Sequence, residues 1–321
     1  MKRILYCVHR YAPYNGGSEN YVKNLAEETL RQGHDVTVFA GEHLGDLHGV
    51  KVTNDPQCIF KKWDLIVVHG GDVGLQNYVL SHARKCISPI LYLLILPSNS
   101  PVCVQALHDV HYIGCSTPAD WRHVEYWNMS HKAVKIRHSI KDEESIGASG
   151  FRERYNITTP YMFLSCGGFW ENKAFRDLVR LFEQSDRPDT TLVLTGYDDR
   201  NGLKAHLEGI PGVMPLMLND RNEVLSALRE TDLYIMHSTS EGFGLVLLES
   251  MWNYAPWAAR HIAGAELLRE YGFTYHTNEE LIEYLKVYRG VTNQHVVQSH
   301  EFVKLAHLVP QSVNDILKVI S

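Results

Sequence analysis

Short runs of apolar residues alternate with segments of helical periodicity along the whole chain. The apolar runs are β-branched or continuously apolar, a pattern typical of strands that are buried on both faces. In the first half of the chain this pattern predicts strands at 4–9, 35–40, 65–69, 90–96, 111–115 and 133–137.

The clearest helix lies between the first two of these strands, at 18–32. Its apolar residues form one stripe, Ser18 is expected to cap its start, and Gly33 is expected to end it. Strands that alternate with helices predict a parallel sheet with helices on both faces.

The composition changes between 141 and 160, where charged residues, glycine and serine replace the apolar pattern and suggest a link between domains. The pattern then begins again. It predicts strands at 161–166, 191–195, 232–236 and 256–259, and helices at 173–184, 219–230, 244–254 and 279–288. We therefore expect an α/β protein with two doubly wound, Rossmann-like domains, 1–143 and 144–321, with the last helix free to pack back on the first domain. Ligands of such sheets bind beyond the carboxyl ends of the strands, so we expect a central cleft between two facing domains.

Composition excludes several function classes. The chain has 321 residues, with 31 basic and 37 acidic side chains and a formal charge of −6, so no excess of positive charge predicts a nucleic-acid partner. The longest apolar run, at 90–96, is too short to span a bilayer. The six cysteines are scattered and the 18 histidines lack ligand spacing, which predicts a reduced, cytoplasmic protein without a metal site, and leaves contact with the cytoplasmic face of a membrane open.

Two adjacent glycines, Gly16 and Gly17, follow the first predicted strand and directly precede a helix. Glycines in this position allow close approach to backbone amides at the positive end of the helix dipole, which favours an anion. A plain tight turn is the alternative.

A second loop carries more chemistry. Gly242 and Gly244 follow a predicted strand and open a helix, so backbone amides there can face a phosphate. Glu241 precedes this helix start, and Glu249 lies on a narrow polar strip of the helix with Asn253. The two carboxylates could bind hydroxyl groups of one diphosphate ligand, or the strip could simply face solvent.

These residues resemble the retaining nucleotide-sugar glycosyltransferases of family 4, which have the GT-B architecture. Glu241 and Glu249 match the E-x7-E motif of that family within a similar stretch from Ser238 to Pro256. The segment from Arg3 through Gly16-Gly17 to Val38 is similar to the opening strand, glycine loop and second strand of the family.

The resemblance implies roles for individual residues. Glu249 would bind the ribose, and Glu241 and Lys173 would be the catalytic residues, with Lys173 also on the diphosphate. The expected donor-binding positions also include Gly16, Gly17, Gly167, Gly242, Phe243, Gly244 and Leu245. His69, at the end of a predicted strand, is a candidate acceptor-side residue.

The chain departs from the family pattern at one basic position. Gly168 stands where the family has an arginine, and Arg176 and Arg200 are candidate substitutes. The chain has no D-x-D triplet, so we expect no metal and no cofactor, only a UDP- or GDP-sugar as co-substrate.

These observations predict a hexosyl- or related glycosyltransferase that moves a sugar to a hydroxyl acceptor with retention. Two alternatives remain. A sugar-nucleotide epimerase of the same fold would turn over its donor without an acceptor, and a non-catalytic protein would bind nucleotide sugars without turnover.

Overall fold

The structure is a computed structural model that describes residues 1–321 except 15, 71–72, 96–100, 143–149 and 200. It divides into two compact units, which we describe separately. Unit 1 contains Met1–Asp142 and also Ala306–Ser321, and unit 2 contains Glu143–Leu305. The end of the chain therefore belongs with its beginning, whereas a single cut along the sequence would assign it to the second half.

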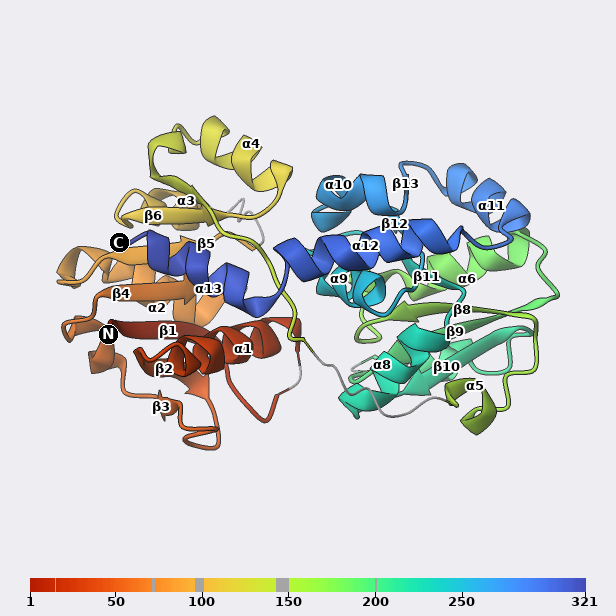
Figure 1. Ribbon diagram of the computed structural model, residues 1–321, viewed down its shortest axis with the longest axis horizontal. Helices are drawn as coiled ribbons and strands as arrows, with labels where there is room; N and C mark the ends of the chain where they lie inside the picture. The colour runs from red at the N-terminus through yellow and green to blue at the C-terminus, as the bar shows by residue number, and fades with distance from the viewer. Residues whose placement is uncertain (15, 71–72, 96–100, 143–149, 200) are drawn as a thin grey trace. The chain divides into compact units, whose positions relative to one another are not determined.

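Unit 1 has a parallel sheet whose described residues form seven strands in the order β3-β2-β1-β4-β5-β6-β7 (Figure 1). The strands are β1 Arg3–Arg10, β2 Asp35–Glu42, β3 Lys51–Thr53, β4 Leu65–His69, β5 Ile90–Leu93, β6 Tyr112–Cys115 and β7 Ala133–Lys135. The helices are α1 Gly17–Arg31, α2 Val73–Ser81, α3 Pro101–Leu107, α4 Pro118–Tyr126 and α13 Val309–Lys318.

Alternate residues of β1 face different helices, which is why its sequence is continuously apolar. Tyr6 is buried toward α1, where its hydroxyl lies 2.8 Å from the hydroxyl of Thr29. Its neighbour Leu5 belongs to a core cluster that includes Val79 and Leu80 of α2. Helices on both faces therefore bury the middle of β1, from Ile4 to Val8.

Helix α1 begins earlier than its sequence suggests. Gly16 is the N-cap, and Ser18 lies inside the first turn, so the expected Ser18 cap is wrong. Gly33 follows the helix with a φ of +84°, a conformation that glycine adopts without strain, as expected for a helix end.

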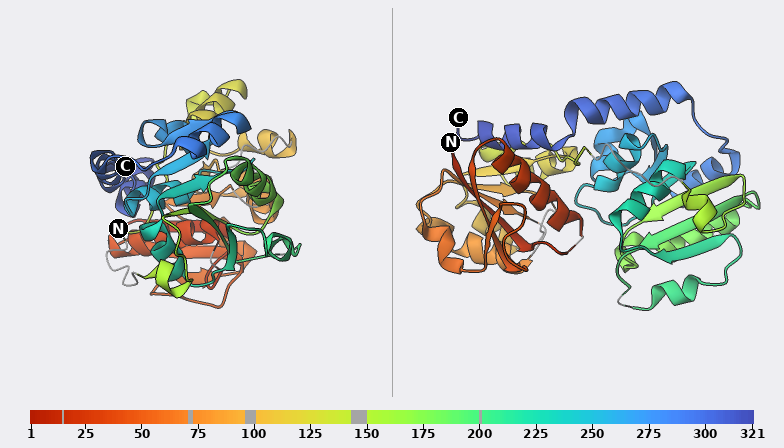
Figure 2. Two further views of the ribbon diagram at one scale, coloured as in Figure 1. Left: turned by 90° about the vertical axis from the view of Figure 1, so that its right-hand side faces the viewer. Right: turned by 60° about the horizontal axis from the view of Figure 1, so that its bottom comes forward.

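Helix α13 packs beside α1 in unit 1 (Figure 2). The Asp315 carboxylate accepts two hydrogen bonds from the Arg137 guanidinium, at 2.7 and 2.6 Å. Tyr21 of α1 donates to the Arg137 carbonyl at 3.2 Å, and Ser312 donates to the same carbonyl at 2.5 Å. These partly buried bonds fix the last helix to the first.

Unit 2 has a second parallel sheet, with six strands among the described residues in the order β10-β9-β8-β11-β12-β13. The strands are β8 Tyr161–Cys166, β9 Thr190–Gly196, β10 Val213–Met217, β11 Leu233–Met236, β12 Trp257–Arg260 and β13 Phe273–Tyr275. The helices are α5 Phe151–Arg154, α6 Phe175–Gln184, α7 Leu203–Leu207, α8 Arg221–Glu230, α9 Leu245–Trp252, α10 Gly264–Leu268, α11 Asn278–Val287 and α12 Asn293–Ala306.

Short 3₁₀ turns complete both units. They are η1 Pro56–Phe60, η2 Ala83–Lys85, η3 Ser130–Lys132, η4 Glu171–Lys173 and η5 Arg269–Tyr271. None of the helices in the described part of the chain is long and apolar enough to cross a membrane.

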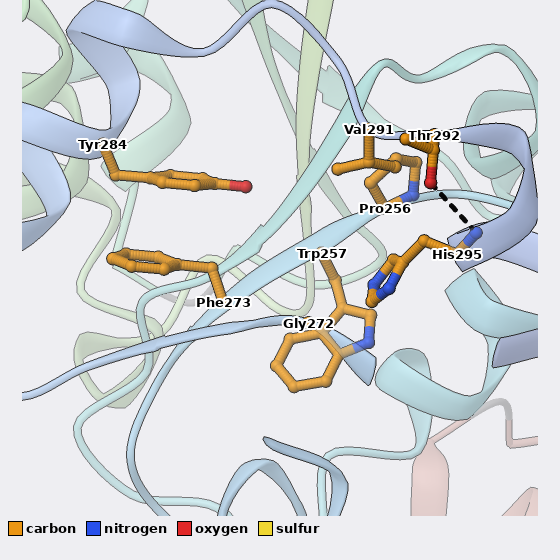
Figure 3. A pocket seen from close by; sticks show the side chains of 8 residues that line it. All are labelled: Pro256, Trp257, Gly272, Phe273, Tyr284, Val291, Thr292 and His295. Atoms are coloured by element: carbon orange, nitrogen blue, oxygen red, sulfur yellow. Dashed lines mark hydrogen bonds between the residues drawn. The ribbon is translucent and has the colours of Figure 1, made fainter. Parts of the chain in front are cut away.

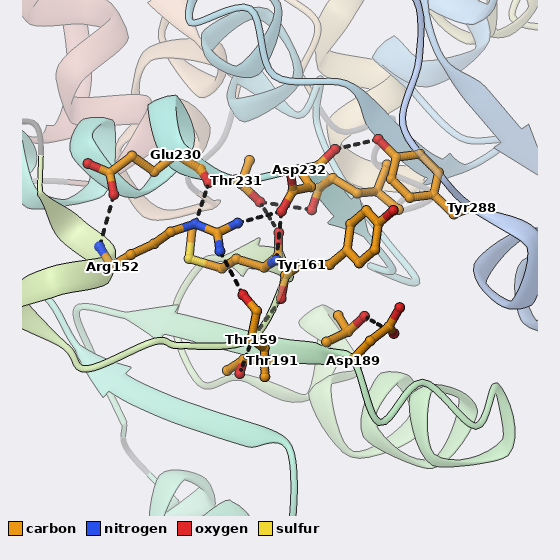
Figure 4. Close-up of polar contacts among 12 residues, drawn as sticks. Arg152, Thr159, Tyr161, Asp189, Thr191, Glu230, Thr231, Asp232 and Tyr288 are labelled. Carbon is orange, nitrogen blue, oxygen red and sulfur yellow. Dashed lines mark hydrogen bonds and ion pairs between the residues drawn. The ribbon is translucent and has the colours of Figure 1, made fainter.

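The amino ends of β8 and β11 are joined by polar contacts around Asp232 (Figure 4). Its carboxylate accepts from the backbone of Met162 at 2.7 Å and from the Arg152 guanidinium at 2.5 Å, while Tyr288 donates to its carbonyl. These bonds tie the two strands together at the amino edge of the sheet.

Both sheets are doubly wound, as predicted. The strand order reverses between β1 and β4 in unit 1 and between β8 and β11 in unit 2. At such a switch point neighbouring loops leave in opposite directions and open a crevice where ligands bind. In unit 2 a ligand is therefore expected at the loops that follow β8 and β11.

Candidate functional site

The loops after β8 and β11 are hydrogen-bonded to each other. The backbone N–H of Thr239 donates to the carbonyl of Asn172 at 2.8 Å, and the Asn172 amide donates back to the carbonyl of Ser240 at 3.3 Å. Two segments that are almost 70 residues apart in sequence thus form one surface.

Lys173 and Glu241 form an ion pair across these loops. The Lys173 Nζ lies 2.5 Å from Glu241 Oε1, and the two side chains are only 16% and 13% exposed. Gly167 makes room for this lysine, because a Cβ at position 167 would lie 2.7 Å from Lys173 Cε. The predicted catalytic residues therefore lie together, with the predicted donor-binding Gly167 against them.

Glu249 has a different basic partner. Arg221, the first residue of α8, donates to both carboxylate oxygens of Glu249, at 2.7 and 3.2 Å. Glu249 is 8% exposed and Asn253 is 6% exposed, and the Asn253 amide donates to the Glu249 carbonyl. The polar strip of α9 is therefore buried, which argues against a purely solvated helix face.

The thiol of Cys166, the last residue of β8, is buried near the charged groups of Glu249, Arg221 and Lys173. Burial raises the pKa of Cys166 to about 12, the Glu249 carboxylate also acts to raise it, and the Arg221 and Lys173 cations oppose the rise. Charges from three separate elements therefore act on one point at the carboxyl end of the central strand.

The glycine loop before α9 requires glycine at position 244. Gly244 is the N-cap of the helix with a φ of +84°, and a Cβ there would lie 2.7 Å from the sulfur of Met236. Phe243 is buried, and its carbonyl accepts from the backbone of Gly264 at 2.9 Å. Gly242 precedes it and Leu245 begins the helix, whose first N–H groups can serve an anion.

Position 168 cannot hold the missing arginine in this loop conformation. A Cβ on Gly168 would lie 2.5 Å from the ring of Trp170. Of the candidate substitutes, Arg176 is exposed on α6, and Arg200 lies outside the described residues. In the part of the chain that the structure describes, Arg221 is the basic residue that joins Lys173 in pairing with a carboxylate of the motif.

The predicted donor-binding glycines of unit 1, Gly16 and Gly17, lie at a helix start that a side chain of the protein already occupies. Gly16 caps α1 and Gly17 begins it, but a Cβ on Gly16 would lie 2.2 Å from the Glu19 carboxylate. Glu19 is buried and accepts from Arg10 at 3.1 Å, so an acidic side chain of the protein itself occupies this helix start. An anion could bind there only if Glu19 moved.

His69 ends β4 and is 5% exposed. Its ring lies 6.1 Å from that of Tyr21, which also stacks on His138 at 4.9 Å. The residue predicted for the acceptor side is thus buried in an aromatic cluster of unit 1.

One acidic residue of the loop after β9 caps the next helix. Asp199 accepts hydrogen bonds from the backbone of Leu203 and Lys204, at 2.8 and 3.1 Å, and so caps α7. Across the residues whose placement is described, no cluster of three or more His, Cys, Asp or Glu side chains could hold a metal ion.

A separate pocket of about 350 Å³ lies near the starts of β12 and β13 (Figure 3). Its lining is largely apolar and aromatic, and consists of Pro256, Trp257, Gly272, Phe273, Tyr284, Val291, Thr292 and His295. It is at the amino edge of the sheet, away from the loops that carry Lys173 and Glu241.

Two residues of the site region were missed by sequence reasoning, Arg221 and His237. Arg221 lies 28 residues before Glu249, and no local pattern indicates that their side chains meet. His237 directly follows β11 and is fully buried, whereas a lone histidine in a sequence is more often at a surface.

The part of the chain that carries this site matches a known protein family. Residues 160–286, all in unit 2, match the family model of glycosyl transferases group 1. A comparison with curated proteins finds no match.

Solved structures match the whole chain at low sequence identity. HepE (Alr3699) of Anabaena, solved with UDP and glucose, has a TM-score of 0.80 and 16% identity over 100% of this chain and 99% of its own. Sucrose-phosphate synthase of Thermosynechococcus elongatus has a TM-score of 0.78 and 14% identity, over 99% and 98% of the two chains. WaaG, a glycosyltransferase of lipopolysaccharide biosynthesis, has a TM-score of 0.74 and 16% identity over 99% of each chain. The chain therefore has the fold of the GT-B glycosyltransferases, and its residues 160–286 match the group 1 glycosyl transferase family.

Proposed function

We propose that the protein transfers a sugar from a nucleoside diphosphate sugar to a hydroxyl group of an acceptor, with retention at the anomeric carbon. The ion pair of Lys173 and Glu241 carries this proposal, because it lies at the switch point of a sheet whose sequence matches the glycosyl transferase family. The fold of the whole chain supports the same activity.

Lys173 would stabilise the leaving diphosphate. Negative charge grows on that group as the glycosidic bond breaks, and a cation held in a partly buried site interacts more strongly with it there than in water. The leaving phosphate would accept the proton of the acceptor hydroxyl, so no side chain needs to form a covalent bond. Glu241 would hold Lys173 and accept hydrogen bonds from hydroxyls of the transferred sugar.

Glu249 would bind the ribose hydroxyls, with Arg221 orienting its carboxylate. A bidentate guanidinium occupies two acceptor positions of a carboxylate and leaves the others for ligand hydroxyls. The start of α9, at Gly244, would supply amides to the diphosphate, and no metal would be needed.

A panel of nucleoside diphosphate sugars tests this function. UDP-glucose is the first donor to test, because HepE was solved in complex with it. A donor that binds only the folded protein stabilises it by about 2.7 kcal/mol at 100 times its Kd, which a thermal-shift assay detects. Transfer to a hydroxyl acceptor, with the product anomer identified by NMR, is the expected result.

Two other outcomes would contradict transfer. Donor turnover without any acceptor would indicate an epimerase, and binding without turnover would indicate a non-catalytic protein.

A chelation assay tests the absence of a metal requirement. We expect turnover to persist in excess chelator, because cationic side chains rather than a divalent ion would neutralise the diphosphate. Complete loss of activity, restored by magnesium or manganese, would contradict this and direct mutagenesis to Asp198 and Asp199.

A further inference from the structure

His237 is fully buried at the point where β11 gives way to the loop that carries Glu241. Its Nδ1 lies 2.7 Å from the hydroxyl of Tyr275, at the end of β13. Its Nε2 lies 2.9 Å from the carboxylate of Asp177, in the first turn of α6, and 2.8 Å from Arg260 Nη2, at the end of β12. One imidazole thus touches side chains from three other elements.

Each tautomer gives both ring nitrogens one hydrogen-bond partner, and the tautomer decides whether Nε2 bonds to Asp177 or to Arg260. With a proton on Nε2, His237 donates to Asp177 and accepts from Tyr275. With the proton on Nδ1, it donates to Tyr275 and accepts from Arg260. Burial lowers the pKa of His237 to about 4, so the ring is neutral at pH 7 in either case.

Arg260 also bonds to the backbone of His237 and to two other side chains. Its Nε donates to the carbonyl of His237 at 3.0 Å, and its Nη2 donates to Asp177 at 3.3 Å and to Asn278 at 3.2 Å. The carbonyl of His237 is therefore held immediately before the loop that leads to Glu241.

Asp177 lies four residues after Lys173, in the first turn of α6. The imidazole and the ion pair of Lys173 with Glu241 therefore span the same two segments, the entry of α6 and the loop after β11. The distance between the lysine and the glutamate depends on how these segments are held.

We propose that His237, through Asp177 and Arg260, is a positioning residue that sets the separation of Lys173 and Glu241 and so controls the rate of sugar transfer more than donor affinity. This inference rests on the proposed function. Donor affinity depends largely on the separate pair of Glu249 and Arg221, whereas stabilisation of the leaving group depends on placing Lys173 within a fraction of an ångström.

Substitution of His237 tests the inference. His237→Leu fills the space but cannot bond to Asp177 or Arg260, and we expect kcat to fall about 100-fold, the scale of a misplacement near 1 Å, with donor Kd within about two-fold of the parent. His237→Gln can present an N–H or an oxygen near the former Nε2, and we expect it to recover at least half of the lost activity on a logarithmic scale.

His307→Gln is the matched control, because His307 is also buried, bonds to the carbonyl of His138 at 2.7 Å, and lies in unit 1. It should lower stability and leave kcat unchanged. If His237→Leu does not fold, Asp177→Asn serves instead, because its side chain is 30% exposed. We expect this variant to lower kcat by about ten-fold through loss of the charged partner.

The outcomes separate the two ideas. A parent protein that transfers no sugar from any nucleotide sugar, whether or not it binds one, overturns the proposed function and this inference together. An active parent whose folded His237→Leu or Asp177→Asn variant keeps its kcat within two-fold, or loses affinity and kcat equally, overturns the positioning role alone.

Discussion

Each carboxylate of the Glu241 and Glu249 pair is held by a basic residue from another part of unit 2. Lys173 holds Glu241, and Arg221 holds Glu249. A partly buried carboxylate without such a partner would be costly to keep ionised. The site is therefore built from two neutralised pairs, and a substitution at either member leaves the other without its partner charge.

Glu249→Ala should raise the donor Kd by about 10- to 100-fold, the cost of hydrogen bonds to a charged group. Arg221→Ala should raise it less, and the two effects should not add, because both act on one contact. Isothermal titration with UDP-glucose measures each Kd. Glu223→Ala is the control, because Glu223 pairs with Arg154 at 3.1 Å on the same helix as Arg221 but outside the motif. Equal affinities for parent and Glu249→Ala would contradict ribose binding.

Lys173→Ala should lower kcat by about 100-fold and donor affinity by much less, because the charge that it stabilises grows toward the transition state. Single-turnover kinetics with saturating donor separates the two effects. Lys204→Ala is the comparison, because Lys204 of α7 also pairs with a glutamate, Glu208, which lies four residues later at the end of that helix. A loss of affinity as large as the loss of rate would indicate simple ground-state binding instead.

At the scale of elements, the central strands could be predicted and some edge strands could not. β1, β4 and β8 are buried on both faces, so their apolar runs are continuous. β10, at one edge of the second sheet, is only partly buried and contains Pro215. Such a strand forms by pairing with its neighbour, β9, and its own sequence lacks the continuous apolar run that predicts a strand.

The candidate site likewise has one part that the sequence predicts and one part that depends on packing. The loop from Glu241 to Glu249 is local, so its glycines and the spacing of its carboxylates are visible in the sequence. The pairing with Arg221 depends on how α8 packs beside α9, which no short segment encodes. The start of α1 was also mispredicted, since Gly16 is the N-cap and the Glu19 side chain lies against it.

Gly244→Ala tests the local part of the site. Alanine at a φ of +84° costs about 1–2 kcal/mol, and its Cβ would also displace the sulfur of Met236, so both stability and donor affinity should fall. Gly33 has the same φ of +84°, but a Cβ there would meet nothing within 4 Å. Gly33→Ala should therefore cost about 1 kcal/mol of stability and leave donor affinity unchanged. Urea denaturation and donor titration measure both effects, and equal donor affinities for the two variants would contradict the role of Gly244.

At the scale of the whole molecule, both units bury neutral histidines. Burial lowers the pKa of His138 in unit 1 to about 3, and that of His237 in unit 2 to about 4, from 6.5. Burial also lowers the pKa of His307. Below pH 6.5 these histidines bind protons in the unfolded chain but stay neutral in the folded chain. Acid should therefore lower the stability of both units.

The free energy of unfolding should therefore change little between about pH 7 and pH 8 and fall steadily as the pH decreases below about 6.5, where the histidines of the unfolded chain become charged. The carboxyls of Asp177 and Glu230 affect the stability only at lower pH, because their ordinary pKa values are 3.8 and 4.5. Burial acts to raise these pKa values, but hydrogen bonds outweigh it and lower them further. Urea titrations at a series of pH values measure the slope.

The same titrations on His138→Gln and His237→Gln assign the slope to each unit. Each variant should be less stable than the parent at pH 7.5, and the difference should narrow toward pH 5, because a glutamine has no proton to take up. Asp120 acts in the opposite sense, since burial raises the pKa of its carboxyl, but it is unchanged in both variants and cancels in the comparison. A stability difference between parent and variants that stays constant from pH 7.5 to pH 5 would show that these histidines do not carry the acid sensitivity of the fold.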